Sequence, residues 1–348
     1  MLPGEVVDGV VVKIEYQHDL KQVQSDAALS RLLSAGCQHA PFDRLEWWQA
    51  LEAHCGLPPL LAVARARDEA VVLPLTGHGG HLSALANWYT FRFRPVLSGS
   101  DDLLTALARD LPRRAHRLTL SRVPDEDGSA TRLAAAFRQA GWLVVREICD
   151  TNHVLPLAGR DYETYLAARP GALRTTLKRK TKKVAVEVLT RFDAAAWAAY
   201  EDIYAESWTP EEGSPAFLRA FAEAEGAAGR LRMGLARGAD DPRGPAIAAQ
   251  MWTVEGGTAF IHKLAHREAA KPLSPGSVLS AALFRHVIDI DGVELVDFGT
   301  GDDPYKRDWM ETVRPRYRLD MFRPLAIRNW PALVRLGLRR LAASAKRS

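Results

Sequence analysis

The sequence predicts an α/β protein with two lobes, each a mixed and mostly antiparallel sheet flanked by helices. Its 348 residues suffice for two domains of ordinary size. Hydrophobic residues make up 47% of the chain and charged residues 25%, which is the balance of a globular protein. Segments with helical spacing and segments typical of strands alternate along both halves, a pattern that predicts sheets covered by helices.

Residues 1–150 are expected to form the N-terminal lobe. Apolar residues at helical spacing follow Asp43, which is placed to cap a helix that stops at Gly56. Two strands, 60–66 and 70–75, are expected next, joined by a tight turn. Helices are then expected at 101–110 and 130–140, and strands at 117–122 and 141–147.

Residues 151–325 are expected to form the second lobe, after a passage between the lobes at 150–160, and residues 326–348 a basic amphipathic tail. Both lobes place helices before paired strands, which suggests a duplicated unit. In the second lobe, helices are expected at 162–168, 172–183, 194–207, 216–224 and 277–290, and strands at 184–189, 231–236, 246–253, 258–265 and 293–298.

Composition excludes several classes of protein. The three cysteines, Cys37, Cys55 and Cys149, are too few and too scattered for a disulfide framework or a zinc cluster. No apolar run reaches the length of a membrane-spanning helix, and the first residues lack the pattern of a signal peptide. We therefore expect a cytoplasmic protein without a structural metal.

Positive charge is concentrated in two segments. The net charge is +4, yet residues 169–183 and 321–348 each hold seven basic residues and no acidic one. A protein that coats nucleic acid usually carries a broader basic face. The remainder of this chain is net acidic, so each basic segment needs its own explanation.

One candidate site lies where a strand is expected to end before a helix. The run Leu273-Ser274-Pro275-Gly276-Ser277 precedes that helix. The first N–H groups of a helix lack partners inside it and, with the helix dipole, attract phosphate. Gly276 would let a ligand approach the backbone. The alternative is an ordinary helix start with serine as its cap.

A second candidate site follows the last expected strand, in the run from Asp297 to Trp309. Ligands of α/β sheets bind beyond such strand ends. Asp303 could accept a proton from an amine or orient it, and Tyr305 could donate one to a leaving group. Lys306 could bind phosphate or stabilise an oxyanion. The alternative is a solvated turn with an internal Asp–Lys pair.

The two basic segments each allow two interpretations. Arg174, Lys178 and Lys182 lie one helical turn apart and would suit a sugar diphosphate, a tRNA backbone or another polyanion, or simply form a solvated face. In the tail, Trp330 belongs to an apolar row beside arginines, which is typical of peripheral membrane attachment. The alternative is a terminal helix packed on the body. His262, Leu264 and His266 are expected to share one strand face, as core or cleft residues.

Residues 229–323 resemble the acetyltransferase domain of CelD-type cellulose-biosynthesis proteins and FemAB-like proteins, which belong to the GNAT superfamily. The resemblance rests on the strands around Gln250, on Leu273–Ser277 and on the run Asp297–Lys306, preceded by the basic stretch 174–180. It implies two GNAT-like lobes and transfer of an acyl group from a thioester to an amine. It also implies that the loop before the helix, with Leu273, Ser274, Gly276 and Ser277, holds the pyrophosphate of coenzyme A.

We therefore predict an N-acyltransferase that uses acetyl-CoA and acts on an amine of a sugar or of a surface-polysaccharide or envelope precursor. Alternatives are a FemAB-type transferase using aminoacyl-tRNA and a non-catalytic binding subunit of an envelope-polysaccharide system. The predicted catalytic residues are Asp303, Tyr305 and Lys306. The predicted substrate contacts are Arg174, Lys178, Gln250, His262, Asp302 and Trp309.

Overall fold

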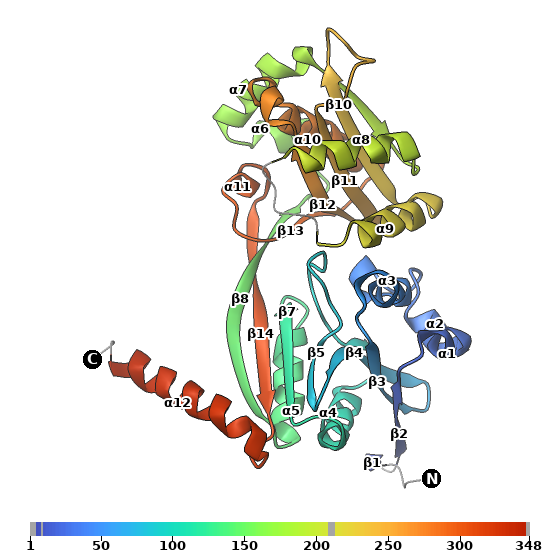
Figure 1. Cartoon of the computed structure of the whole chain (residues 1–348), viewed down its shortest axis with the longest axis vertical. Coiled ribbons are helices and arrows are strands. Elements are labelled where there is room, and N and C mark those ends of the chain that lie inside the picture. The colour runs from blue at the N-terminus through green and yellow to red at the C-terminus, as the bar shows by residue number, and fades with distance from the viewer. Residues whose placement is uncertain (1–4, 8–9, 208–212, 346–348) are drawn as a thin grey trace. The chain divides into compact units, whose positions relative to one another are not determined.

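The structure, a computed structural model, describes residues 5–7, 10–207 and 213–345 and divides into two compact units (Figure 1). The first unit comprises Met1–Leu33, Gly56–Asp150 and Pro315–Ser348, and the second comprises Ser34–Cys55 and Thr151–Arg314. This division departs from the predicted boundaries in two places. An early segment, 34–55, joins the second unit, and a late one, 315–348, joins the first.

The strands of the first unit follow the order β1-β2-β3-β4-β5-β7-β14-β8, with β6 beside β4. The pair β5–β7 is parallel. Helices α4 and α5 pack their apolar residues, among them Leu104 and Phe137, into the core of this unit. The bounds are β1 Glu5–Val7, β2 Val10–Gln17, α1 Leu20–Ser25, α2 Ala27–Leu32, β3 Pro59–Ala66, β4 Glu69–His78, β5 His81–Ala84, β6 Val96–Ser98, α4 Asp101–Asp110, β7 Arg117–Val123, α5 Ser129–Gln139, β8 Leu143–Pro156, β14 Thr312–Phe322 and α12 Trp330–Ala345.

Strand β14 was not predicted from the sequence, because its arginines interrupt the apolar pattern. Arg316 is almost completely buried and donates to Glu126 at 2.8 Å. A buried arginine is tolerated only with such a partner, and the partner lies 190 residues away in the chain. Strand β8 is also longer than expected. The passage predicted at 150–160 continues as strand to Pro156.

The strands of the second unit follow the order β8-β13-β12-β11-β10-β9, in which β12–β13 is the parallel pair. Each unit thus contains one parallel pair whose strands are connected through a helix, as the suggested duplication requires. The bounds are α3 Leu45–Cys55, α6 Tyr162–Ala167, α7 Gly171–Lys180, β9 Val184–Leu189, α8 Ala194–Ala205, α9 Pro215–Ala227, β10 Leu231–Gly238, β11 Ala248–Glu255, β12 Thr258–His266, α10 Pro275–Arg285, β13 Leu295–Thr300 and α11 Lys306–Trp309.

Helix α10 lies close against the sheet of the second unit. A Cβ atom on Gly234 would come within 2.7 Å of Leu279 Cδ1, so the glycine lets the leucines of the helix pack directly on the strand. Trp252 on β11 meets Phe284 edge-on, with ring centroids 5.0 Å apart. This apolar contact fixes the height of α10 above the strands and therefore the position of its first turn.

The early segment 34–55 is held in the second unit by a buried ion-pair cluster. Arg44 lies 2.8 Å from Glu225 and 3.1 Å from Glu255, and all three side chains are at most 3% exposed. Trp47 of α3 also packs edge-on against Phe217 of α9, with centroids 4.9 Å apart. These contacts join residues that lie far apart in the sequence, which explains why periodicity assigned this helix to the other lobe.

Candidate active site

The site begins where the parallel strands β12 and β13 separate. They pair at Thr258–Leu295, Ala259–Val296 and Phe260–Asp297. Strand β12 then continues to His266 without a further pair to β13 among the residues described. Among the described residues, the recorded pairing of the two strands thus ends at Phe260 and Asp297.

A bulge in β12 decides which side chains face α10. The register with β11 shifts between Met251–Lys263 and Trp252–Ile261, so that His262 is an extra residue. A bulge reverses the alternation of faces beyond it. Leu264 and His266 consequently line a pocket beside α10.

His262 faces the other side of the sheet, contrary to the prediction that it shares a face with Leu264 and His266. Its ring lies 5.1 Å from that of Phe221 and its Nε2 2.8 Å from Thr253 Oγ1. Burial lowers the pKa of His262 to about 3, so the imidazole is neutral. The bulge therefore removes His262 from the predicted set of substrate contacts.

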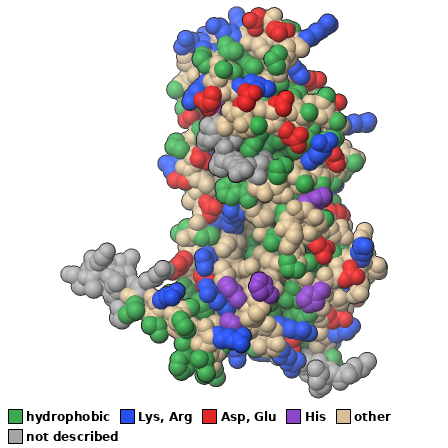
Figure 2. All heavy atoms as spheres, in the orientation of Figure 1, with side chains coloured by type: hydrophobic (Ala, Val, Ile, Leu, Met, Phe, Trp, Pro, Cys, Tyr) green, Lys and Arg blue, Asp and Glu red, His purple; other side chains and the backbone are tan. Residues whose placement is uncertain are grey.

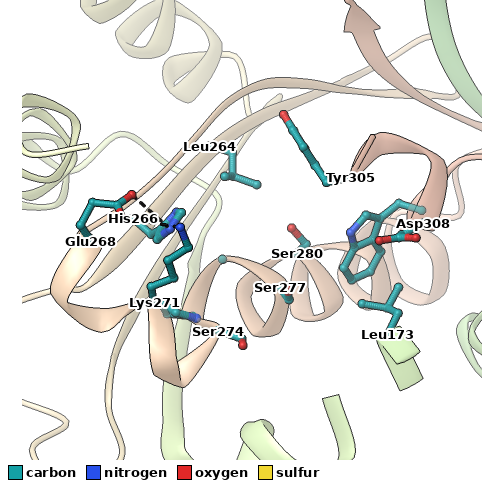
Figure 3. Close-up of a pocket in the computed structure, with 13 residues that line it drawn as sticks. Leu173, Leu264, His266, Glu268, Lys271, Ser274, Ser277, Ser280, Tyr305 and Asp308 are labelled. Carbon is teal, nitrogen blue, oxygen red and sulfur yellow. Dashed lines mark ion pairs between the residues drawn. The ribbon is translucent and has the colours of Figure 1, made fainter. Parts of the chain in front are cut away.

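The pocket has a volume of about 610 Å³ and lies entirely within the second unit (Figure 3). Residues from β12, the loop after it, α7, α10 and the turn after β13 contribute to its wall. The lining residues are Leu173, Leu264, His266, Glu268, Lys271, Ser274, Pro275, Gly276, Ser277, Ser280, Tyr305, Asp308 and Trp309.

The start of α10 forms one end of this pocket. Ser274 adopts the left-handed conformation (φ 52°, ψ 45°), and its side chain does not cap the helix. A non-glycine residue in that conformation costs about 1–3 kcal/mol and persists only where its surroundings require it. Helix α10 then presents Gly276 and Ser277 to the pocket, so the N–H groups of its first turn lie at the wall. Phosphate binding at this turn stays a prediction, and Leu273 does not line the pocket.

Gln250, on strand β11, positions the first turn of α10 from the side of the sheet. Its Nε2 donates to the Gly276 carbonyl at 3.0 Å and to Ser280 Oγ at 2.8 Å, and its Oε1 accepts from Trp252 Nε1 at 2.9 Å. The side chain is fully buried, contrary to the prediction that it contacts substrate. Gln250 acts instead as a positioning residue for α10.

Charged side chains surround the same end of the pocket. His266 Nε2 lies 4.0 Å and Lys271 Nζ 3.7 Å from the carboxylate of Glu268, as Figure 3 shows for the first pair. Burial lowers the pKa of His266, so its ring is neutral at pH 7. Lys180 donates to the Pro272 carbonyl at 2.7 Å and holds the loop. Lys271 is the exposed cation of this group and is well placed to meet an anion.

Aromatic residues form the opposite end. In Figure 3, Tyr305 and Asp308 lie across Ser277 and Ser280 from His266. Burial raises the pKa of Tyr305 to about 12, so its hydroxyl keeps its proton at physiological pH. Trp309 stacks on Phe284 with centroids 4.9 Å apart, which fixes this wall to α10. Tyr305 and Trp309 are therefore placed in the pocket as sequence reasoning expected.

The acidic part of the turn after β13 stabilises the turn itself. Lys306 is buried, and its Nζ donates to the carbonyls of Thr300 and Gly301. Asp303 Oδ2 lies 3.7 Å from Lys306 Nζ. Neither side chain lines the pocket, contrary to their predicted catalytic positions.

Asp302 lies in the same turn and is held by two partners outside the pocket. It accepts from Arg307 at 2.7 and 2.8 Å and lies 3.1 Å from His153 Nε2. Arg307 lowers the pKa of Asp302, which therefore stays ionised. Asp302 was predicted to contact substrate, but it is not among the residues that line this pocket.

Helix α7 contributes its apolar side to the pocket and its basic side to solvent. Leu173 lines the pocket, whereas Arg174 and Lys178 are exposed beside it. Sequence reasoning also missed Ser280 and Asp308. Ser280 lies three residues after Ser277 on α10, and this spacing alone places both on one helix face.

A known family matches part of the second unit. Residues 171–307 match the sequence profile of the family described as acetyltransferase (GNAT) domain. No curated protein matches the chain.

Several solved structures share the fold at low sequence identity. FemX superposes with a TM-score of 0.60 and 10% identity over 88% of this chain and 96% of FemX. The C-terminal domain of a protein described as lysylphosphatidylglycerol synthetase, from Agrobacterium fabrum, superposes with a TM-score of 0.59. The sequence identity is 12%, and the match covers 90% of this chain and 95% of that domain. L-PGS from Bacillus licheniformis superposes with a TM-score of 0.50 and 12% identity, and the match covers 78% of this chain and 86% of L-PGS. At these identities the likeness establishes the fold alone.

The matched range 171–307 includes α7, β12, α10 and Tyr305, which contribute to the pocket, whereas Asp308 and Trp309 lie just beyond that range. The match of residues 171–307 to a GNAT acetyltransferase domain supports an enzyme of the acyltransferase type.

Proposed function

We propose that the chain transfers an acyl group from a coenzyme A thioester, with acetyl-CoA as the expected donor, to an amine of a sugar or of a surface-polysaccharide or envelope precursor. The observation that carries this proposal is a single pocket containing both the first turn of α10 and Tyr305. A CoA thioester needs both features, an anion site for its pyrophosphate and a proton donor at its sulfur.

The donor half of the proposal rests on the charged end of the pocket. The N–H groups of Gly276 and Ser277 would bind the pyrophosphate, with Lys271 adding a positive charge at its edge. The pantetheine arm would lie along the wall of the pocket that Leu264 and His266 of β12 form.

The chemical step rests on the aromatic end. The amine nitrogen attacks the thioester carbonyl, the carbon–sulfur bond breaks, and the departing thiolate takes a proton from the Tyr305 hydroxyl. Tyr305 suits this role because its hydroxyl lies in the pocket and is protonated at physiological pH. The Asp308 carboxylate, on the same side of the pocket, would orient the incoming amine and accept the proton that its nitrogen loses, and solvent then returns a proton to the Tyr305 oxygen.

Gly276→Ala tests the donor half. A Cβ atom there would meet only His266 Nδ1 and Leu264 Cδ2, both at 3.9 Å, so the variant should fold. The methyl group would occupy the wall where the pyrophosphate binds. Wild-type protein at 100 times Kd of CoA should gain roughly 2.7 kcal/mol in thermal unfolding, and Gly276→Ala should lose most of this gain.

Gly36→Ala is the matched control for this experiment. Gly36 lies in the same unit, and an added Cβ would approach only Ser34 Oγ at 3.7 Å. The control should respond to CoA as wild type does. If neither CoA nor acetyl-CoA shifts the unfolding of wild-type protein, the donor assignment fails.

A second donor, aminoacyl-tRNA, is favoured by one observation. The exposed Arg174 and Lys178 continue α7 directly from Leu173 in the pocket, and a tRNA backbone could follow them. Filter binding of charged tRNA at 50 and 200 mM salt separates the donors. Tight, salt-sensitive binding without a response to CoA would establish the tRNA donor instead.

A further inference from the structure

Helix α12 and the turn before it expose a row of large apolar side chains. Leu325, Ile327, Trp330, Val334 and Leu338 are each between 56% and 89% exposed. A single exposed leucine is ordinary, but a contiguous row of this kind on a globular protein marks an interaction site.

The row follows one side of the helix. Positions 327, 330, 334 and 338 are separated by three, four and four residues, the spacing that places side chains on one face. Figure 1 shows α12 extending away from the other elements of the first unit. The named side chains of this row are therefore exposed rather than packed on the first unit.

The start of α12 is firmly attached. Asn329 is almost fully buried, and its Nδ2 donates to the carbonyls of His116 at 2.7 Å and Arg323 at 3.0 Å. Its Oδ1 lies 2.9 Å from His116 Nδ1. The helix is thus presented from a fixed base on the first unit.

The charge of this segment indicates what covers the row. Residues 321–348 contain seven basic residues and no acidic one. Arg328 and Arg335 are exposed on α12 and the turn before it, and Figure 2 shows basic side chains beside the hydrophobic ones where α12 starts. An apolar row flanked by charge of one sign matches the acyl and headgroup layers of an anionic lipid surface. No helix in the part of the chain that the structure describes is long and apolar enough to cross a bilayer.

We propose that residues 325–338 form a membrane-surface anchor that lies in the headgroup layer and selects anionic lipids. Leu325, Ile327, Trp330, Val334 and Leu338 enter the acyl boundary, and the arginines contact lipid phosphates. This goes beyond the acyl-transfer proposal and does not depend on it. The anchor holds the first unit at a membrane whichever donor and acceptor the second unit uses.

Co-sedimentation of the full chain with vesicles tests the anchor. Vesicles of phosphatidylcholine with 30% phosphatidylglycerol should bind the protein at least about tenfold more tightly than pure phosphatidylcholine, and added salt should reduce this difference. Binding that is equal on both vesicles, or absent from both, would overturn the proposal.

The variant Val334→Glu/Leu338→Glu should weaken binding to the anionic vesicles by about a hundredfold, because each side chain contributes roughly tenfold through its burial. Ile290→Glu is the matched control, since Ile290 is 71% exposed in the second unit and should bind as wild type. Circular dichroism confirms that both variants fold. Trp330→Ser, a milder change, should weaken binding by about tenfold.

The remaining alternative is that a second copy of the chain covers the row, and light scattering of the wild-type chain without lipid tests it. A monomer agrees with the proposal. A dimer that Val334→Glu/Leu338→Glu dissociates would overturn it, because a second copy would then cover the row.

Discussion

Gln250 Nε2 lies 3.0 Å from the carbonyl oxygen of Gly276, so a fully buried amide on the central strand β11 holds the first turn of the helix that forms the donor end of the pocket. The bond links two residues that both belong to the resemblance motifs of the sequence. Gln250 therefore positions the first turn of α10 and does not itself contact substrate.

Gln250→Leu should lower the free energy of unfolding by about 2–3 kcal/mol. The change keeps side-chain size but leaves the Gly276 carbonyl, Ser280 and the Trp252 indole without this partner in a buried place. Urea unfolding measures the effect. Gln22→Leu, at an exposed position of α1, should change stability by less than about 0.5 kcal/mol.

Tyr305→Phe should reduce kcat roughly 10²–10⁴-fold while leaving CoA affinity unchanged. Phenylalanine preserves the edge contact with Phe298, at 5.6 Å between centroids, and removes only the proton donor. Tyr162→Phe is the control, because Tyr162 also has a pKa raised by burial to about 12 but lies outside the pocket. Steady-state rates of thiol release distinguish the two. An unchanged kcat in Tyr305→Phe would remove Tyr305 from the mechanism.

Lys306→Met and Lys271→Met should have opposite signatures. Lys306 binds two carbonyls of its own turn, so its loss should destabilise the fold by about 2 kcal/mol. Lys271 is exposed at the pocket, so its loss should leave stability unchanged and weaken CoA binding by up to about fivefold at low salt. Thermal unfolding with and without CoA reports both effects. A stable but inactive Lys306→Met would restore its predicted catalytic role.

Glu255 should make stability depend on pH. Burial raises its pKa from 4.5 to about 7, and this effect outweighs the opposite influence of Arg44. The folded state therefore binds a proton that the unfolded state releases between pH 4.5 and 7. The stabilisation is present below pH 4.5 and is lost as pH rises through 7, by up to about 3 kcal/mol.

Glu255→Gln should remove this dependence and be more stable than wild type at pH 8. Urea unfolding at pH 5, 6, 7 and 8 measures the slope. Glu294→Gln, an exposed change in the same unit, should keep the wild-type slope. If Glu255→Gln retains that slope as well, another group titrates.

Sequence reasoning located both loops of the pocket but misjudged several side chains within them. The local signals, a Ser-Pro-Gly helix start and an acidic turn with tyrosine, depend on neighbouring residues and were readable. Whether Lys306 faces the ligand or its own carbonyls depends on how the turn closes, which no spacing reveals. The face of His262 likewise depends on one bulge, set by the pairing of β12 with β11.

The amino-acid sequence alone determined the α/β class, most helices and strands, and the start of α10. It also determined that Tyr305 lies in the turn after the last strand of the second unit and that an apolar row beside arginines runs near residue 330. These features were readable because periodicity and turn chemistry are local properties. Tertiary structure decided the placement of 34–55 in the second unit, the burial of Gln250 and the exposure of the α12 row. These depend on which distant surfaces meet, and the free energy of burying or exposing a side chain is a property of that meeting.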